Sequence, residues 1–417
     1  MNRNKIHLIF AFIMAFTFVT TQASSISYYN ESEVDLNIRV NPTIEHESID
    51  HPLINEYSYL NLNNNTITYN NANYWQGFYN KLKNTSIEQV SIVHIGDSHL
   101  QADIATRRTR ALFHEQFGDA GRGLIAPLKI AKTNEPIDYY FKCNSPYVSA
   151  SLMRHPWKSN IRLTGVSFSP KNENFNIAIG TVTNQNINST FSRIRIHVDG
   201  DLYIDSVMAD NISVDYKIYE NSQSFTDIIF SRPVSNVELW LSSIGRLSIL
   251  GASLLKGDSG VIYNVIGNNG ASFMSYNKMG QLGEDCTNLN PDLFIISLGA
   301  NEAFGNLTND GFYNSIKTFV DDLIISNPNI PILLVTPMEC QRKGQINHKI
   351  KQFRDVILQF GVENNIAVYD WYNVAGGYNA SSHWVKDGLM SKDRIHNTNK
   401  GYSIQGTLLY EVLTRDL

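Results

Sequence analysis

The chain contains little of what several classes of protein depend on. Only three of its 417 residues are cysteines, Cys143, Cys286 and Cys340, and their spacing matches no metal-binding motif. Charged residues make up 18% of the chain and the net charge is -5, with no basic stripe. The low charge and the missing stripe argue against nucleic acid as the main partner.

A long apolar run is also missing, apart from a short one near the start of the chain. Arg3 and Lys5 precede the apolar residues 9–16, and residues 21–23 resemble a small-residue cleavage site. This layout is typical of a secretory signal peptide, which we assign to residues 1–23. An uncleaved membrane anchor is the alternative, but the run is short for a membrane span.

Export has consequences for the cysteines and for the location of the protein. No cysteine follows the proposed cleavage point directly, which argues against a lipoprotein. We expect buried thiols, although an exported protein could form one disulfide. We therefore expect a periplasmic or secreted protein that has no stable membrane span after cleavage.

The composition supports a large packed structure. Hydrophobic residues make up 42% of the chain, and 417 residues suffice for two domains or for one large domain with an insertion. Residues 24 to about 70 are rich in Asn, Ser and Thr, which indicates a surface-hugging arm or a flexible lead-in. Trp75, Phe78 and Leu82 then recur at helical spacing. We assign residues 24–85 to an N-terminal arm and a lead-in helix.

Apolar segments and helix-length segments alternate in the rest of the chain, with one interruption. The predicted strands are residues 89–95, 261–266, 293–298, 332–335 and 366–369. The predicted helices are residues 100–116, 309–326, 345–364 and 400–414. Continuous apolar runs are typical of strands that are buried on both faces of a parallel sheet. The alternation predicts a three-layer, doubly wound α/β domain in two parts, residues 86–126 and 258–417.

The interruption, residues 127–257, is rich in short strand patterns. The clearest of these patterns lie at residues 175–179, 193–198, 214–219 and 237–241. Turn residues separate them, and the segment is too long to be a loop. We predict an inserted all-β domain of the sandwich or jelly-roll type.

Polar residues that could carry chemistry follow the predicted strands. Ser98 follows the first strand, Gly270 the second and Asn301 the third, while Asp393 and His396 lie before the last helix. Ligands of open α/β sheets bind at the carboxyl ends of the strands, so these residues are expected at one edge. A turn that only caps a helix is the alternative for Ser98.

The five residues together match the needs of acyl transfer. A nucleophilic serine requires a base and a group that orients the base, and only His396 among the eleven histidines has an aspartate three residues before it. The backbone N–H groups of Ser98 and Gly270 and the amide of Asn301 could hold an oxyanion. The alternatives are ordinary: Asp393 and Asn301 could cap helices, and Gly270 could end a strand.

The sequence resembles the SGNH (GDSL-type) hydrolases. The resemblance lies in Gly96-Asp97-Ser98, Gly267-Asn268-Asn269-Gly270, Gly299-Ala300-Asn301-Glu302 and Asp393-x-x-His396. It covers residues 86–125 and 258–417 and implies a flavodoxin-like α/β fold without a cofactor. It also assigns the roles of the site residues.

By this resemblance Ser98 is the nucleophile, His396 is its base and Asp393 orients the base. Ser98, Gly270 and Asn301 form the oxyanion hole. Gly267 could align in place of Gly270.

A narrower resemblance comes from the residues around the serine. His99, Gln101-Ala102-Asp103 and Ala120-Gly121-Arg122-Gly123 before a β-rich insertion resemble the bacterial peptidoglycan O-acetylesterases and related exported carbohydrate esterases. In those proteins the inserted module is similar to carbohydrate-binding jelly rolls. Trp157 and Trp240 could stack on sugar rings, but aromatic residues of a sandwich are more often part of its core.

Two further patterns are set aside. Gly257-Asp258-Ser259-Gly260 repeats the Gly-Asp-Ser triplet, but Ser259 precedes a strand and is expected at the opposite edge of the sheet. His94, Asp97, His99 and Asp103 could suggest a metal site. His94 lies inside a strand, however, and the segment at Asn301 lacks the histidine of a Gly-Asn-His-Glu ligand loop. We therefore expect no metal.

The resulting hypothesis is an exported serine esterase that removes O-acetyl groups from a polysaccharide, with peptidoglycan as the first choice. Acetylxylan or another acetylated glycan is the alternative substrate. A polysaccharide O-acetyltransferase would use the same triad, and a non-catalytic glycan-binding protein is the least favoured alternative.

Overall fold

The computed structural model describes residues 54–69, 73–182 and 190–417. The assigned signal peptide and most of the proposed arm lie outside these ranges. None of the helices in the described ranges is both long and apolar enough to cross a membrane. Residues 54–69 form two 3₁₀ turns, η1 (Ile54–Glu56) and η2 (Leu62–Asn64), and bury Ile54 and Leu60 in a core cluster.

A six-stranded sheet forms the centre of the α/β part. Its strands are β1 (Ile67–Thr68), β2 (Gln89–Gly96), β15 (Gly260–Gly267), β16 (Leu293–Ser297), β17 (Ile332–Val335) and β20 (Ala367–Tyr369). They lie in the order β1-β20-β17-β16-β2-β15, and all are parallel except β1. The five parallel strands, numbered along the chain, have the spatial order 2-1-3-4-5. This is the flavodoxin-like doubly wound order, and it confirms the predicted fold class.

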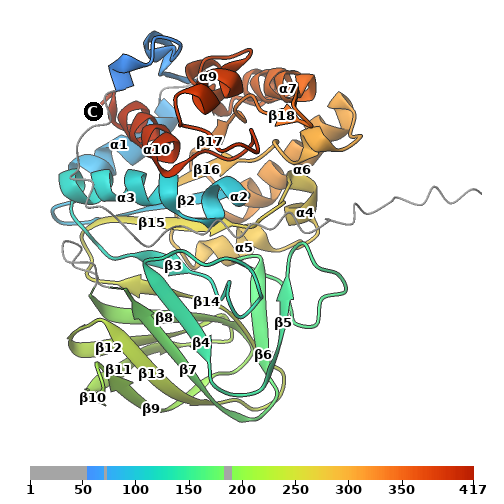
Figure 1. Ribbon diagram of the computed structural model, residues 1–417. Coiled ribbons are helices and arrows are strands. Elements are labelled where there is room, and N and C mark those ends of the chain that lie inside the picture. Colours follow the sequence, from blue (N-terminus) through green and yellow to red (C-terminus); the bar gives the residue numbers. More distant parts are fainter. Residues whose placement is uncertain (1–53, 70–72, 183–189) are drawn as a thin grey trace, which may run out of the picture. The chain divides into compact units, whose positions relative to one another are not determined.

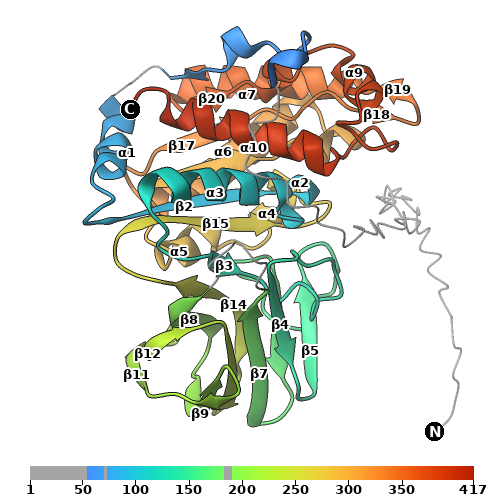
Figure 2. The same cartoon turned by 60° about the vertical axis from the view of Figure 1, so that its left-hand side comes forward.

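Helices cover both faces of the sheet (Figures 1 and 2). One face carries α1 (Asn73–Lys83), α3 (Ile104–Phe117), α8 (Trp371–Val374), α9 (Ala380–Lys386) and α10 (Asn399–Thr414). The other face carries α4 (Phe273–Asn277), α5 (Leu282–Thr287), α6 (Asn309–Ser326) and α7 (His348–Asn364). Alternate residues of one strand serve the two cores, because successive side chains of a strand point to opposite faces. Leu293 thus packs in one cluster and Phe294 in the other.

The single helix predicted for residues 100–116 is wrong in one respect. The segment forms two helices, α2 (Ser98–Gln101) and α3, with a break at Ala102 and Asp103. Asp103 has a φ of 56° and its carboxylate accepts a hydrogen bond from the Thr106 hydroxyl. The left-handed backbone of Asp103 ends the first helix, because it cannot continue a right-handed one.

The insertion forms two antiparallel sheets that share one core. One sheet has the order β10-β9-β13-β7-β4; the other has the order β11-β12-β8-β14-β6-β5, with β3 paired to β14. The strands are β3 (Gly123–Ile125), β4 (Tyr139–Cys143), β5 (Tyr147–Ser151), β6 (Val166–Pro170), β7 (Asn174–Thr181), β8 (Phe191–Asp199), β9 (Tyr203–Ala209), β10 (Ile212–Ser213), β11 (Tyr216–Asn221), β12 (Phe225–Val234), β13 (Asn236–Ser242) and β14 (Ser248–Leu255). Ile177 of the first sheet and Ile196 of the second are buried in the same cluster, so the predicted all-β insertion is a sandwich.

Details of the insertion differ from the expectations. The strand β3 lies within the segment assigned to the hydrolase part, yet it pairs with β14 of the sandwich. The core position favoured for Trp240 is wrong, because this side chain is 37% exposed on β13. Trp157 is partly buried against the core of the α/β part and stacks on His155.

All three cysteines of the chain are free thiols.

Candidate active site

Ser98 lies at the junction of β2 and α2. Asp97 is the N-cap of α2, and its carboxylate accepts a hydrogen bond from the His99 N–H at 3.0 Å. Ser98 is the first residue of the helix and is partly exposed. A Cβ at Gly96 would lie 2.8 Å from the carbonyl oxygen of Ser297, so a glycine is needed where β2 passes β16. The turn therefore both caps a helix and presents the serine.

His396 and Asp393 approach Ser98 from the loop before α10. Ser98 Oγ lies 2.9 Å from His396 Nε2, and His396 Nδ1 lies 2.7 Å from Asp393 Oδ2. The other oxygen of Asp393 accepts hydrogen bonds from the N–H groups of Ile395 and His396. The cap of α10 is Thr398, so the structure contradicts the interpretation of Asp393 as a helix cap.

The surroundings of Asp393 favour its ionised form. Burial alone would raise the pKa of its carboxyl group, but the hydrogen bonds from the His396 ring and from two backbone N–H groups lower it below its usual value. An ionised Asp393 requires the proton of the imidazole to be on Nδ1. Nε2 is then left as the acceptor for the Ser98 hydroxyl, which is the arrangement that a general base needs.

The two backbone donors expected at the oxyanion hole are available. Neither the N–H of Ser98 nor that of Gly270 meets a hydrogen-bond acceptor within the described ranges. Gly270 has a φ of 76°, which favours glycine. Gly267 has a different reason to be glycine, because its Cβ would lie 2.6 Å from the backbone nitrogen of Gln101. Each glycine therefore has its own structural reason, and Gly270 remains the proposed donor.

Asn301 is held more firmly than its type alone suggests. Its Nδ2 donates to Asp97 Oδ2 at 3.1 Å and to the carbonyl oxygen of Ala271 at 2.9 Å. Asn301 precedes a 3₁₀ turn, η3 (Glu302–Phe304), but its side chain makes no cap hydrogen bond. Both amide hydrogens are thus engaged, and one must be shared or released before Asn301 can donate to an oxyanion.

Two buried carboxyl groups flank this amide, and the sequence reasoning gave neither a role. Burial raises the pKa of Asp97 to about 6, although the hydrogen bond from the His99 N–H and the nearby His396 work in the opposite direction. Burial also raises the pKa of Glu302 to about 7. Glu302 Oε1 accepts the N–H of Phe273, and Oε2 has no partner within the described residues. Their only signal in the sequence was their place beside Ser98 and Asn301.

The two histidines that could suggest a metal site contact hydroxyl groups. His94 uses both ring nitrogens, one toward the hydroxyl of Tyr263 at 2.8 Å and one toward that of Ser297 at 2.7 Å. His99 Nδ1 lies 3.0 Å from the hydroxyl of Tyr402. Burial lowers the pKa of both histidines to about 3, so both rings are neutral at ordinary pH. In the described part of the chain no group of three or more His, Cys, Asp or Glu could hold a metal ion.

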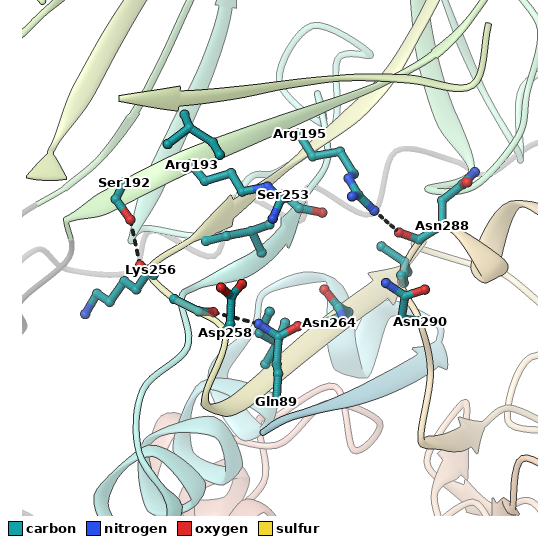
Figure 3. Close-up of a pocket in the computed structure, with 15 residues that line it drawn as sticks. Gln89, Ser192, Arg193, Arg195, Ser253, Lys256, Asp258, Asn264, Asn288 and Asn290 are labelled. Atoms are coloured by element: carbon teal, nitrogen blue, oxygen red, sulfur yellow. Dashed lines mark hydrogen bonds between the residues drawn. The ribbon is translucent and has the colours of Figure 1, made fainter. Parts of the chain in front are cut away.

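The second Gly-Asp-Ser triplet lies elsewhere. Ser259 directly precedes β15, whereas Gly270 follows the carboxyl end of that strand. Gly257 and Asp258 line a cavity of about 300 Å³, to which the sandwich contributes Arg193 and Arg195 (Figure 3). This cavity lies at the amino end of the sheet and does not include Ser98.

One segment of the chain matches a model of a known protein family. Residues 246–404 match the GDSL-like Lipase/Acylhydrolase family. The matched segment contains Gly270, Asn301, Asp393 and His396. Ser98 lies before it, on the other side of the inserted sandwich, so only the folded structure joins the serine to the matched residues.

One solved structure has a similar overall architecture, and others match a smaller part of the chain. A peptidoglycan O-acetylesterase is 20% identical with a TM-score of 0.69, and the match covers 84% of this chain and 99% of that chain. A lipase/acylhydrolase from Enterococcus faecalis is 22% identical with a TM-score of 0.31, covering 38% of this chain and 78% of that one. An acetyl xylan esterase is 19% identical with a TM-score of 0.31, covering 36% and 80%. No curated protein matches the sequence. Residues 246–404 of this chain are thus similar to the GDSL-like Lipase/Acylhydrolase family, and its overall fold is similar to that of the peptidoglycan O-acetylesterase.

Proposed function

We propose that this protein is an exported serine esterase that removes O-acetyl groups from a polysaccharide, with peptidoglycan as its substrate. The proposal rests above all on one series of contacts. Ser98 Oγ lies 2.9 Å from His396 Nε2, and the opposite ring nitrogen lies 2.7 Å from Asp393. These residues come from the two ends of the α/β part and meet at the carboxyl edge of the sheet. A nucleophile, a base and its orienting carboxylate are the groups that ester cleavage requires.

In this mechanism His396 takes the proton of Ser98 as Oγ attacks the acetyl carbonyl carbon. The N–H groups of Ser98 and Gly270 hold the oxyanion of the tetrahedral intermediate, and Asn301 becomes the third donor when one of its amide hydrogens is shared with or released from Asp97 or Ala271. When the intermediate collapses, the bond to the sugar oxygen breaks and His396 returns the proton to that oxygen. Water then attacks the acetyl-enzyme with the same assistance, which releases acetate and restores the serine.

An ester substrate is preferred because a sugar alkoxide leaves more readily than an amine. Peptidoglycan is preferred because the fold of this chain, insertion included, is similar to that of a peptidoglycan O-acetylesterase over 84% of its length. By analogy with the inserted jelly rolls of the peptidoglycan O-acetylesterases, we expect the insertion to contribute to binding the polymer. An acetylated xylan would need the same chemistry and different contacts.

Acetate release tests the proposal. The purified protein is incubated with O-acetylated peptidoglycan and, separately, with acetylated xylan, and free acetate is measured. We expect release from peptidoglycan and none from the Ser98→Ala variant, because the nucleophile is missing. Ser259→Ala is the matched control, since this serine is exposed in the second Gly-Asp-Ser triplet and should leave the rate unchanged.

Three results would contradict parts of the proposal. Full activity of Ser98→Ala would remove the assigned nucleophile. Preferential release from xylan would replace the substrate but keep the mechanism. Acetylated acceptor sugars in place of free acetate would show a transferase.

A further inference from the structure

The turn formed by residues 268–270, which presents the Gly270 N–H, is held by hydrogen bonds to residues outside it. Its first residue, Asn268, donates from its side chain to the carbonyl oxygen of Thr164 and to the hydroxyl of Tyr276, both at 3.0 Å. Thr164 belongs to the inserted sandwich, where the neighbouring Gly165 leaves no room for a Cβ beside Asn268. One end of the turn is therefore held by the insertion.

Gln101 holds the middle of the same turn. Its Oε1 accepts the backbone N–H of Asn269 at 2.6 Å. Its Nε2 donates to Thr133 Oγ1 at 2.8 Å and to Asn134, at 2.8 Å for the carbonyl oxygen and 2.7 Å for Oδ1. Gln101 is 3% exposed, so water does not compete well for these hydrogen bonds. Asn269 also donates directly to Asn134 at 2.7 Å.

One carboxamide thus joins three segments that are far apart in the chain. Gln101 is the last residue of α2, the helix that begins with Ser98, and it is rigidly placed because α2 packs against Gly267. Thr133 and Asn134 belong to the insertion, and Asn269 belongs to the turn. The insertion's loop is itself anchored, since the Arg154 guanidinium donates to the carbonyl oxygens of Ala131 and Lys132.

We propose that Gln101 is a positioning residue for the oxyanion hole, and that through it the loop at Thr133 and Asn134 of the insertion fixes the direction of the Gly270 N–H. This inference rests on the proposed function of Ser98 and Gly270. Loss of the hydrogen bonds made by the Gln101 carboxamide would let the turn move by fractions of an ångström. Such a shift weakens a hydrogen bond to the transition state more than it weakens binding of the ground state.

The test uses Gln101→Met, which keeps the length of the side chain and removes its donor and acceptor. We expect kcat for p-nitrophenyl acetate to fall about 10- to 100-fold, less than the loss of a whole oxyanion donor, with KM changed less than about twofold. The rate at which a phosphonate ester modifies Ser98 should fall in parallel, because its phosphoryl oxygen uses the same donors. The control is Asn327→Leu, which removes a buried amide whose hydrogen bonds join α5 and α6 and include no residue of the site. It should lower the melting temperature without changing kcat.

The exposed Asn134 provides a second variant if Gln101→Met does not fold. Asn134→Ala removes the side-chain acceptor shared by Gln101 and Asn269, and we expect kcat to fall about 3- to 10-fold. In the double variant the effects should be less than additive, since both act through one contact. Wild-type kcat in either folded variant would overturn the inference, as would a change confined to KM. An inactive wild-type protein would instead overturn the proposed function.

Discussion

Glu302 is a carboxyl group in surroundings that disfavour its charge. It is 6% exposed, follows Asn301 directly and has one oxygen without a partner within the described residues. Burial raises its pKa from 4.5 to about 7, and the nearby Asp97 carboxylate adds to the rise. A group whose pKa is higher in the folded than in the unfolded state stabilises the fold below the unfolded pKa. This stabilisation is lost as the pH rises through the folded value.

The Glu302→Gln variant tests whether the raised pKa of Glu302 lowers the stability of the fold as the pH rises. A glutamine keeps the acceptor for the Phe273 N–H and carries no charge at any pH. We expect the variant to gain stability relative to the wild type between pH 5 and pH 8, by up to about 3 kcal/mol. Urea denaturation at both pH values measures the difference. The exposed Glu284→Gln is the control for the loss of one carboxylate, and an equal effect of pH on both variants would contradict the expectation.

Some site residues were predictable from the sequence and others were not. Ser98 at a strand end and the Asp393-x-x-His396 pair before the last helix were expected to meet, because a nucleophilic serine needs a base and an orienting carboxylate and the family resemblance assigns these roles. The hydrogen bonds of Gln101 were not predictable, because its partners Thr133 and Asn134 come from an insertion whose position relative to α2 is not encoded in any local pattern. The exposure of Trp240 was equally hidden, since alternation in a strand does not say which face is covered.

At the scale of elements, a group of four charges connects α3 to the insertion. Asp103 accepts from Arg110 at 2.6 Å and from Arg122 at 2.8 Å, and Asp138 accepts from the same two arginines at 3.1 Å. Arg122 also lies over the ring of Tyr139 at 4.8 Å. Burial alone would raise the pKa of Asp103, but the charges of Arg110 and Arg122 outweigh it and hold the pKa well below its usual value of 3.8.

Removing one charge of this group should lower the stability of the fold. Asp103→Asn leaves two buried guanidinium groups with one carboxylate, and we expect it to lower the free energy of unfolding by about 3 to 5 kcal/mol at pH 7. The control is Asp321→Asn, which breaks an exposed pair with Lys317 and should cost less than about 1 kcal/mol. Because the pKa of Asp103 is depressed in the fold, its contribution is present above pH 3.8 and is lost as the pH falls below it.

Urea denaturation of both variants measures these losses of stability, and equal losses would contradict a structural role for the group.

The break between α2 and α3 at Asp103 belongs to the same scale. Helical propensity continued through residues 100–116 and predicted one helix. The contacts of the Asp103 carboxylate with Thr106 and two arginines outweighed that local preference.

At the scale of the whole molecule, the order of the strands explains why distant residues meet. Parallel strands β2 and β16 are neighbours at the point where the winding of the sheet reverses, and their carboxyl ends carry Ser98 and Asn301. Ligands of doubly wound sheets bind at this switch point. The alternation of strands and helices in the sequence predicted this architecture. Strands buried on both faces are continuous apolar runs, whereas helices buried on one face repeat their apolar residues at helical spacing. The way the sandwich contacts the site depends on tertiary packing and came only from the structure.

The most direct test of the pairing of Ser98 with His396 is covalent labelling of the folded protein with a fluorophosphonate, followed by mass spectrometry of the labelled peptide. We expect a single adduct on Ser98, no adduct in Ser98→Ala, and labelling slowed on the order of 10²-fold or more in His396→Ala because the base is lost. An adduct on Ser259 of the second triplet, or labelling of Ser98 at the wild-type rate without His396, would contradict the account.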